Sequence, residues 1–209
     1  NPEGLHVPAG ARLKGKAIMQ PDALQVLFSV DTTLYRGKRV HDDFICAYRF
    51  AILTGMRPGE LLGLCWDDVR GDIVTIRRAV NVLGEETHGK NENAVRAFAL
   101  SGFSRSVLEQ QRAVTGAGDS VFTIKSEGYF YKRWQVYLRA NDLPPVSLYS
   151  LRHTFVSIVK SLPEGEIKGL VGHSQSMDTF GWYSHELTGD AENTARDVDA
   201  RFIKLLGSG

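Results

Sequence analysis

The sequence predicts a mainly α-helical domain with a small antiparallel β-sheet, an α+β fold. Apolar residues recur at helical spacing in several segments, most clearly in residues 41–53 and 102–114. Residues 72–100 change period: β-branched residues precede a glycine turn at 83–85, and residues 95–100 alternate between apolar and polar. We therefore expect two or three short strands placed between helices.

Local signals mark where several of these elements begin and end. Pro21-Asp22 is typical of a helix start, and Thr54-Gly55 is typical of a helix end. We expect helices, in chain order, at 20–30, 41–53, from 56 onward, 102–114, 129–140, 151–159 and 197–206. We expect non-helical structure at 35–39, where basic residues form an exposed loop, at 121–124, which is short and extended, and at 163–165, where proline and glycine break a helix.

The chain divides into three parts. Residues 1–19 are rich in glycine and proline and show no sustained period, so they are expected to form a linker or arm. Residues 20–185 carry the main helical and strand patterns and are expected to form the principal domain. Residues 186–209 are expected to be a C-terminal tail that contains a short amphipathic helix at 197–206.

Composition restricts the class of protein. The 209 residues suffice for one sizeable core, or for one domain with extensions. No run of about 18 apolar residues could span a bilayer, and the first residues lack the pattern of a signal peptide, so no membrane partner is expected. Cys46 and Cys65 lie in apolar helical patterns, which favours reduced core residues of a cytoplasmic protein.

The charge is unevenly distributed along the chain. The net charge is only +1, but residues 161–209 hold four Lys or Arg and eight Asp or Glu. An acidic tail therefore offsets a moderately basic body. Overall charge does not exclude a DNA-binding protein, because a local basic patch decides that interaction.

Three side chains near the C-terminal end suit attack by a tyrosine on a phosphodiester: Arg152, His173 and Tyr183 supply a cation, an imidazole and a phenol in that order. Each has an ordinary explanation when taken alone, as an ion-paired arginine, a helix-capping histidine and a core tyrosine. Upstream, Arg57 precedes a helix start, where backbone N–H groups favour an anion, and Lys90 lies in a polar turn.

Taken together, the motifs resemble a known family. The segments T-G-M-R-P-G-E-L-L-G-L-C-W-D-D-V, Y-S-L-R-H-T-F, V-G-H-S and T-F-G-W-Y-S-H occur in one order. This order resembles the catalytic domain of the tyrosine recombinases, the phage and conjugative-transposon integrases, over roughly residues 20–206. The resemblance implies a tyrosine recombinase catalytic-domain fold. It also implies a site-specific recombinase that integrates or excises a mobile element through a covalent 3′-phosphotyrosine.

The resemblance assigns roles residue by residue. It implies the first arginine at Arg57, the acidic residue after it at Glu60, the β-turn lysine at Lys90, the second arginine at Arg152, the histidine at His173 and the nucleophile at Tyr183. Tyr149 stands where the family usually has histidine or sometimes lysine. A phenol with a pKa of about 10 is a poor base near neutral pH but a good hydrogen-bond donor, so proton transfer at this position stays open.

The resemblance also implies partners. We expect double-stranded DNA at specific recombination sites, a homotetramer on that DNA, and a missing N-terminal DNA-binding domain before residues 1–19, in a bacterial or phage-infected cell. The C-terminal helix either docks on a neighbouring subunit or packs on its own domain. Candidate DNA contacts are the basic residues Lys14, Lys16, Arg36, Lys38, Arg39, Lys132 and Arg133.

No cofactor is expected. The sequence shows no carboxylate cluster suited to Mg²⁺ and no Cys/His spacing suited to Zn²⁺, so the expected chemistry is independent of metal and ATP. Two alternatives stay open beside the recombinase. One is a type IB topoisomerase, which shares this chemistry. The other is a non-catalytic DNA-binding regulator with the same fold, for which Tyr149 is the supporting feature.

Overall fold

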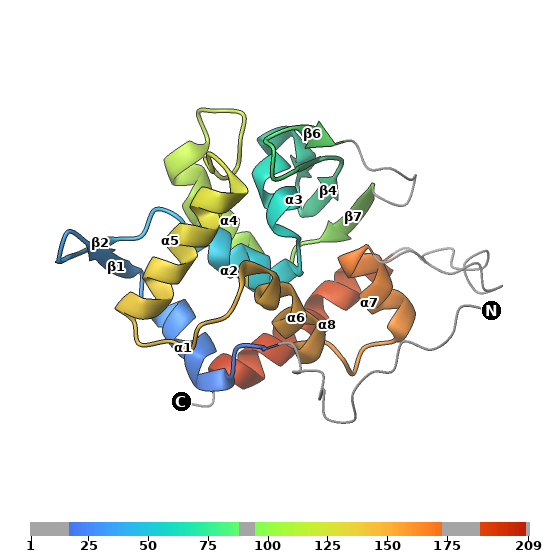
Figure 1. Ribbon diagram of the computed structural model, residues 1–209. Helices are drawn as coiled ribbons and strands as arrows, with labels where there is room; N and C mark the ends of the chain where they lie inside the picture. Colours follow the sequence, from blue (N-terminus) through green and yellow to red (C-terminus); the bar gives the residue numbers. More distant parts are fainter. Residues whose placement is uncertain (1–16, 88–94, 173–188, 208–209) are drawn as a thin grey trace, which may run out of the picture.

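The fold is mainly helical with small antiparallel sheets, which confirms the predicted α+β class (Figure 1). The computed structural model describes residues 17–87, 95–172 and 189–207. The helices are α1 (Pro21–Ser29), α2 (Ile45–Thr54), α3 (Pro58–Gly63), the 3₁₀ helix η1 (Trp66–Asp68), α4 (Gly102–Thr115), α5 (Glu127–Ala140), α6 (Leu148–Ile158), α7 (Glu164–Val171) and α8 (Asp190–Leu206). Within the described ranges, no helix is long and apolar enough to cross a membrane.

The strands form three small sheets, all antiparallel. The strands are β1 (Thr32–Tyr35), β2 (Lys38–His41), β3 (Val69–Arg70), β4 (Ile73–Ile76), β5 (Ala79–Val80), β6 (Glu86–Thr87) and β7 (Arg96–Ala99). A three-stranded sheet has the order β3-β4-β7, while β1 pairs with β2 and β5 pairs with β6. Antiparallel strands at 72–100 and the turn at 83–85 are therefore confirmed, but the described residues of this range form four strands in two sheets rather than two or three strands in one, with β5 and β6 flanking the turn.

Residues 35–39 are exposed and non-helical as predicted, but they form the end of a β-hairpin rather than a loop. Strands β1 and β2 pair from Thr32 with His41 to Tyr35 with Lys38. Arg36 and Gly37 both have positive φ, the conformation that a two-residue hairpin turn requires. The helix predicted from residue 41 therefore begins only at Ile45.

Two other predicted boundaries differ from the structure. The break predicted at 163–165 is instead the start of α7, because Pro163 is its N-cap residue and Glu164 and Glu166 occupy its first turn. The C-terminal helix begins at Asp190, seven residues before the predicted start. Its first turn is acidic rather than apolar, and negative side chains favour a helix N-terminus without adding to the apolar period.

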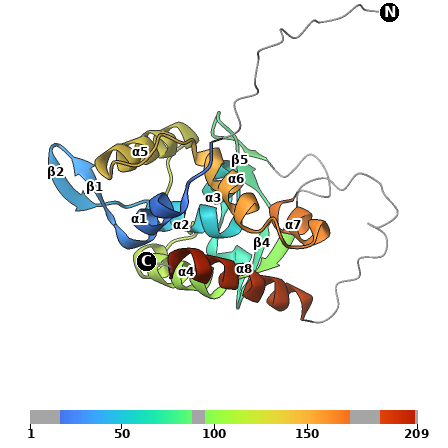
Figure 2. The ribbon, with the colours of Figure 1, turned by 90° about the horizontal axis from the view of Figure 1, so that it is seen from below.

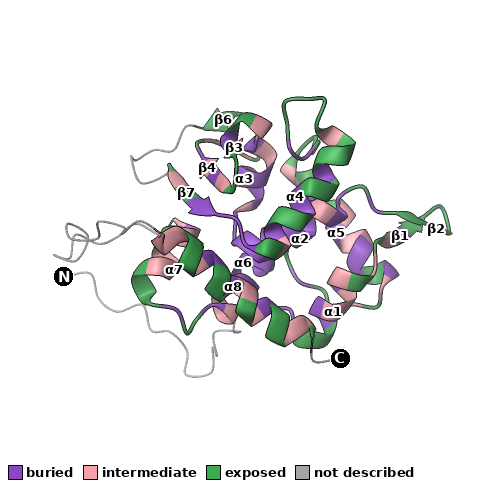
Figure 3. Ribbon diagram, turned by 180° about the vertical axis from the view of Figure 1, so that it is seen from behind, coloured by how far each residue is buried: buried purple, intermediate pink, exposed green. Residues whose placement is uncertain are grey.

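Helix α2 is the centre of the core. Every residue of this helix except Cys46 is buried, and Figure 3 shows it covered by the surrounding helices. Tyr48 packs against three rings of α5, and the closest is Trp134 at a centroid distance of 4.7 Å. Three aromatic residues of α5 therefore face the core, namely Phe130, Trp134 and Tyr137, while Tyr131 and Lys132 face solvent.

Helix α8 packs on its own domain in this structure. Phe202 is fully buried, and its ring lies 6.3 Å from that of Phe28 on α1. The Asp199 carboxylate accepts hydrogen bonds from the backbone N–H groups of Gly102 and Phe103 at the start of α4. Figure 2 shows α8 running beside α4. This is one of the two expected arrangements, and contact of this helix with a neighbouring subunit stays a prediction.

The end of α2 requires glycine. Gly55 has φ +66°, and a Cβ at this position would lie 2.5 Å from the Phe155 ring. We expect Gly55→Ala to lower the free energy of unfolding by more than about 1 kcal/mol in urea denaturation. Gly37→Ala is the matched control, because Gly37 has φ +77° but no atom within 4 Å of the added Cβ. Equal losses in the two variants would contradict the steric argument.

Candidate active site

Arg57 is positioned by the helix that it precedes. It is the N-cap residue of α3, and its backbone N–H donates to Glu60 Oε2 at 2.8 Å. The Arg57 guanidinium folds onto the same carboxylate, with Nη1 donating to Glu60 Oε1 at 2.7 Å. Glu60 therefore fixes both the backbone and the side chain of Arg57, as expected for two residues three apart at a helix start.

Arg96 completes the binding of that carboxylate. Its Nη1 and Nη2 donate to Oε1 and Oε2 of Glu60 at 2.9 and 2.8 Å, and the exposed fractions of the two side chains are only 8% and 6%. Burial alone would raise the pKa of Glu60, but hydrogen bonds and charge from Arg96 and Arg57 lower it to about 2. The carboxylate is therefore ionised at any physiological pH.

Arg152 reaches the same region from α6. Its side chain is buried, and it donates from Nη1 to the Gly55 carbonyl at 2.8 Å and from Nη2 to the Val171 carbonyl at 2.6 Å. These carbonyls lie at the C-terminal ends of α2 and α7, where helix carbonyls lack partners within the helix. Burial and the positive charge of Arg57 lower the pKa of Arg152 to about 10, so it stays charged at neutral pH.

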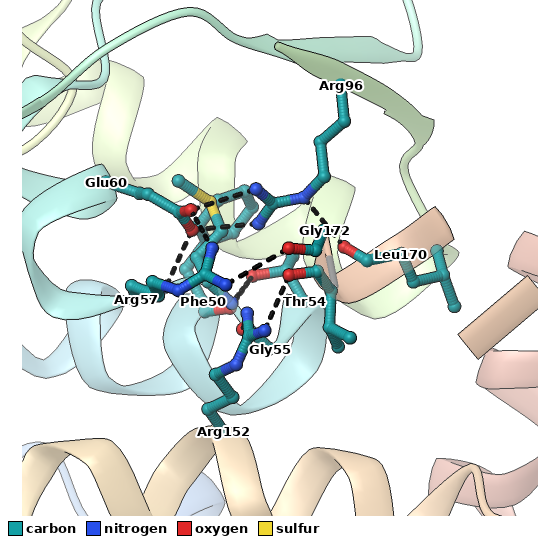
Figure 4. Close-up of polar contacts among 11 residues, drawn as sticks. Phe50, Thr54, Gly55, Arg57, Glu60, Arg96, Arg152, Leu170 and Gly172 are labelled. Atoms are coloured by element: carbon teal, nitrogen blue, oxygen red, sulfur yellow. Dashed lines mark hydrogen bonds and ion pairs between the residues drawn. The ribbon is translucent and has the colours of Figure 1, made fainter. Parts of the chain in front are cut away.

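Three consecutive carbonyls at the end of α7 each accept a hydrogen bond from a different arginine (Figure 4). The donor to Leu170 is Arg96 Nε at 3.0 Å, the donor to Val171 is Arg152, and the donor to Gly172 is Arg57 Nη2 at 3.1 Å. Gly172 ends the helix with φ +64°. The end of α7 therefore lies beside both predicted catalytic arginines, and His173 follows it in the sequence.

The remaining predicted groups fall in two classes. Lys90, His173 and Tyr183 lie outside the described residues. Tyr149 is described: it lies in the first turn of α6, is 41% exposed, and packs edge-on against the His153 ring. Burial lowers the pKa of Arg57, but Glu60 and, to a smaller extent, Tyr149 raise it, and the net shift is upward. Tyr149 therefore lies close enough to the site to interact with its first arginine.

Sequence reasoning missed Arg96 as a site residue. Its partners lie 36 residues away at Glu60 and 74 residues away at Leu170, so no local motif joins them. One signal was available: Arg96 is two residues before Phe98 in an alternating strand, so the two share a face, and Phe98 is buried. A charged residue on the buried face of a strand needs a buried partner.

The predicted DNA contacts differ in their surroundings. Arg36, Lys38 and Lys132 are exposed. The Arg39 guanidinium instead ties the β1–β2 hairpin to the end of α5, donating to Asn141 Oδ1 and to the Ala140 carbonyl, both at 2.7 Å. Arg133 is mostly buried, and its Nη2 lies 3.5 Å from the Asp42 carboxylate. Lys14 and Lys16 lie outside the described residues.

The described side chains include no group of three or more His, Cys, Asp or Glu residues that could hold a metal ion. Cys46 and Cys65 are both free and half-buried. The polar chemistry of the region is therefore that of arginines, one carboxylate and backbone carbonyls. Such a group can stabilise an anion, because each guanidinium keeps donors beyond those already used.

The chain is similar in sequence to several known proteins. Residues 19–189 match the sequence pattern of the phage integrase family. The ICEBs1 integrase of Bacillus subtilis is 23% identical over 73% of the chain, and a tyrosine recombinase XerC-like protein of Caldanaerobacter subterraneus is 22% identical over 80%. The chain spans about half the length of these curated relatives, 47% and 51%.

A solved structure shows the same fold. The Tn1549 transposon integrase, in complex with transposon right end DNA, superposes with a TM-score of 0.62 at 17% identity. The match covers 88% of this chain and 66% of the Tn1549 chain. At this identity the likeness concerns the fold alone, a mainly helical domain with small antiparallel sheets.

Proposed function

The chain belongs to the phage integrase family, and on that premise we propose that it is the catalytic part of a site-specific DNA recombinase. The observation that carries the proposal is the meeting of Arg57 and Arg152 at the C-terminal end of α7. Two arginines held beside one helix end form a cationic site of fixed geometry, which suits the phosphodiester of a DNA strand.

The arginines retain donors for a phosphate. A guanidinium has five N–H groups, and Arg152 uses two of them on carbonyls. Arg57 uses one on Glu60 and one on the Gly172 carbonyl, so each arginine keeps N–H groups beyond those that it donates to these partners in the described part of the chain. A phosphodiester gains negative charge on its non-bridging oxygens as it is attacked, and donors that are already fixed stabilise that charge without reorganisation.

We propose that Tyr183 is the nucleophile. Its phenolic oxygen forms a bond to phosphorus while the bond from phosphorus to the 5′-oxygen breaks, which leaves a 3′-phosphotyrosine and a 5′-hydroxyl. The phenolic proton passes to water as the bond to phosphorus forms, the leaving oxygen takes a proton from Lys90, and His173 donates a hydrogen bond to the phosphate. Because the phosphodiester is replaced by another ester of similar energy, the reverse attack by a 5′-hydroxyl rejoins DNA without ATP.

The proposed substrate is double-stranded DNA at the ends of a mobile element, acted on by a tetramer. The relatives support this choice by their kind: one is the ICEBs1 integrase, and the solved Tn1549 integrase is bound to transposon end DNA. The exposed basic residues Arg36, Lys38 and Lys132 are candidates for contacts with the DNA backbone.

A nicked suicide substrate tests the proposal. The DNA carries the junction sequence of the element that encodes the chain, and we expect a covalent protein–DNA adduct whose linkage maps to Tyr183 by mass spectrometry. Tyr183→Phe is expected to form no adduct, while Tyr129→Phe, which removes the hydroxyl of an exposed tyrosine on α5, should form it normally. An adduct with Tyr183→Phe would disprove the nucleophile assignment. DNA binding without any adduct would indicate a non-catalytic regulator.

A further inference from the structure

We propose that Arg96 is a positioning residue, which fixes Arg57 and the end of α7 in the geometry that DNA cleavage needs. The inference rests on the proposed function, and it concerns a residue that makes no contact of its own with the reacting phosphate. Arg96 lies at the first position of β7 and is 8% exposed at its side chain.

The first contribution of Arg96 is to the geometry of the shared carboxylate. Each oxygen of Glu60 accepts twice: Oε1 from Nη1 of Arg57 and Nη1 of Arg96, and Oε2 from the Arg57 backbone N–H and Nη2 of Arg96. Two parallel hydrogen bonds from one guanidinium fix the plane of a carboxylate. Without Arg96, the Glu60 carboxylate could rotate, and the Arg57 guanidinium that depends on it would rotate too.

The second contribution of Arg96 is its positive charge. Glu60 carries one negative charge, and Arg57, Arg96 and Arg152 together carry three positive charges. If Arg57 were the sole partner of Glu60, its charge would be largely neutralised within the pair. Because Arg96 shares the carboxylate through two hydrogen bonds, the cluster retains a net positive charge beside the exposed part of Arg57. That surplus charge is what a phosphodiester would bind.

The third contribution of Arg96 is its contact with the end of α7, which leads to His173. Arg96 Nε donates to the Leu170 carbonyl at 3.0 Å. A Cβ on Gly172 would lie 2.8 Å from Arg96 Nη1 and 3.0 Å from Arg96 Cδ, so the Arg96 side chain rests directly on the α7 end. Arg96 also follows Lys90 by six residues in the chain. The Arg96 side chain therefore contacts both Glu60, which holds Arg57, and the end of α7, which His173 follows in the sequence.

Single-turnover cleavage of the suicide DNA tests the role. Arg96→Lys keeps a positive charge but lacks the planar guanidinium fork, which donates at the same time to both oxygens of Glu60 and to the Leu170 carbonyl. We expect the cleavage rate to fall about 100-fold, as for small misplacements of catalytic groups. The dissociation constant for DNA should stay close to wild type, because Arg57 and Arg152 are still present and charged.

Two further variants separate positioning from loss of folding. Arg105→Met is the matched control. Arg105 Nη2 pairs with the Asp72 carboxylate at 2.7 Å, between α4 and the β3–β4 turn. This variant should cleave DNA at the wild-type rate. Arg96→Ala removes the fork, and added guanidinium ion should restore part of its cleavage rate. Rates are compared at a temperature at which circular dichroism shows every variant fully folded.

The outcomes decide between the hypotheses. Cleavage by folded Arg96→Lys at the wild-type rate would overturn the positioning role, and so would a loss in DNA affinity that fully accounts for the lower rate. Failure of guanidinium to rescue Arg96→Ala would contradict a requirement for the fork. A wild-type protein that forms no adduct would contradict the recombinase proposal itself, which keeps the two failures distinct.

Discussion

Replacing Arg152 with lysine is expected to lower the rate of DNA cleavage on the order of 10²–10³-fold, the usual cost of losing one preorganised donor to a transition state. Arg152 bonds the Gly55 and Val171 carbonyls and still has N–H groups for a phosphate. A lysine ammonium has three donors at one point, so it cannot span both carbonyls and a phosphate oxygen in the same geometry.

The same substitution is expected to destabilise the fold. A carbonyl that loses its buried donor costs about 1–3 kcal/mol, and Arg152→Lys leaves at least one of the two carbonyls in that state. Single-turnover cleavage of the suicide DNA and urea denaturation measure the two effects separately. Arg105→Lys, on the exposed pair with Asp72, is the control and should change neither. Cleavage by Arg152→Lys within a few-fold of wild type, taken as less than about tenfold, would contradict the proposed role.

The part of the site that could be predicted from sequence is the local part. Arg57 and Glu60 are three residues apart at a helix start, so their contact follows from the chain geometry itself. Arg152 lies in a motif that resembles the tyrosine recombinases, and this resemblance implied its role. The structure places Arg152 near Arg57. Arg96 could not be assigned in the same way, because its bonds to Glu60 and Leu170 depend on how the sheet packs against α3 and α7.

The fold shows the same division. The continuous apolar composition of α2 and the apolar period of α4 made both helices predictable, since α2 is buried on all sides and α4 on one face. The β1–β2 hairpin was missed because its strands are largely exposed, so their side chains follow no apolar alternation and a basic cluster resembled a loop. The Arg36-Gly37 turn was the usable signal. The first turn of α8 was missed for a similar reason, because its acidic residues carry no apolar period.

Removing the Glu60 carboxylate is expected to have the largest effect on stability. Glu60→Ala leaves Arg96 buried without a counter-charge, and breaking a buried pair from one side costs about 3–5 kcal/mol. Glu60→Gln keeps the shape and should cost less, because its amide oxygen still accepts one of the hydrogen bonds. Urea denaturation at neutral pH measures both. Glu164→Gln, which changes an exposed carboxylate paired with Lys168 in the first turn of α7, is the control and should lose less than about 1 kcal/mol.

The pH dependence of stability gives a sharper test of Glu60. Its folded-state pKa of about 2 lies below the ordinary value of 4.5. The unfolded chain therefore binds a proton more readily, so Glu60 stabilises the folded state fully above pH 4.5, and this contribution is lost as the pH falls toward 2. The shift in the pKa of Glu60 corresponds to about 3 kcal/mol in the free energy of unfolding.

Between pH 4.5 and 2, wild type should lose about 3 kcal/mol more stability than Glu60→Gln, whose amide binds no proton in this range. Parallel stability curves for the two proteins across that range would show that Arg96 and Arg57 do not hold Glu60 ionised.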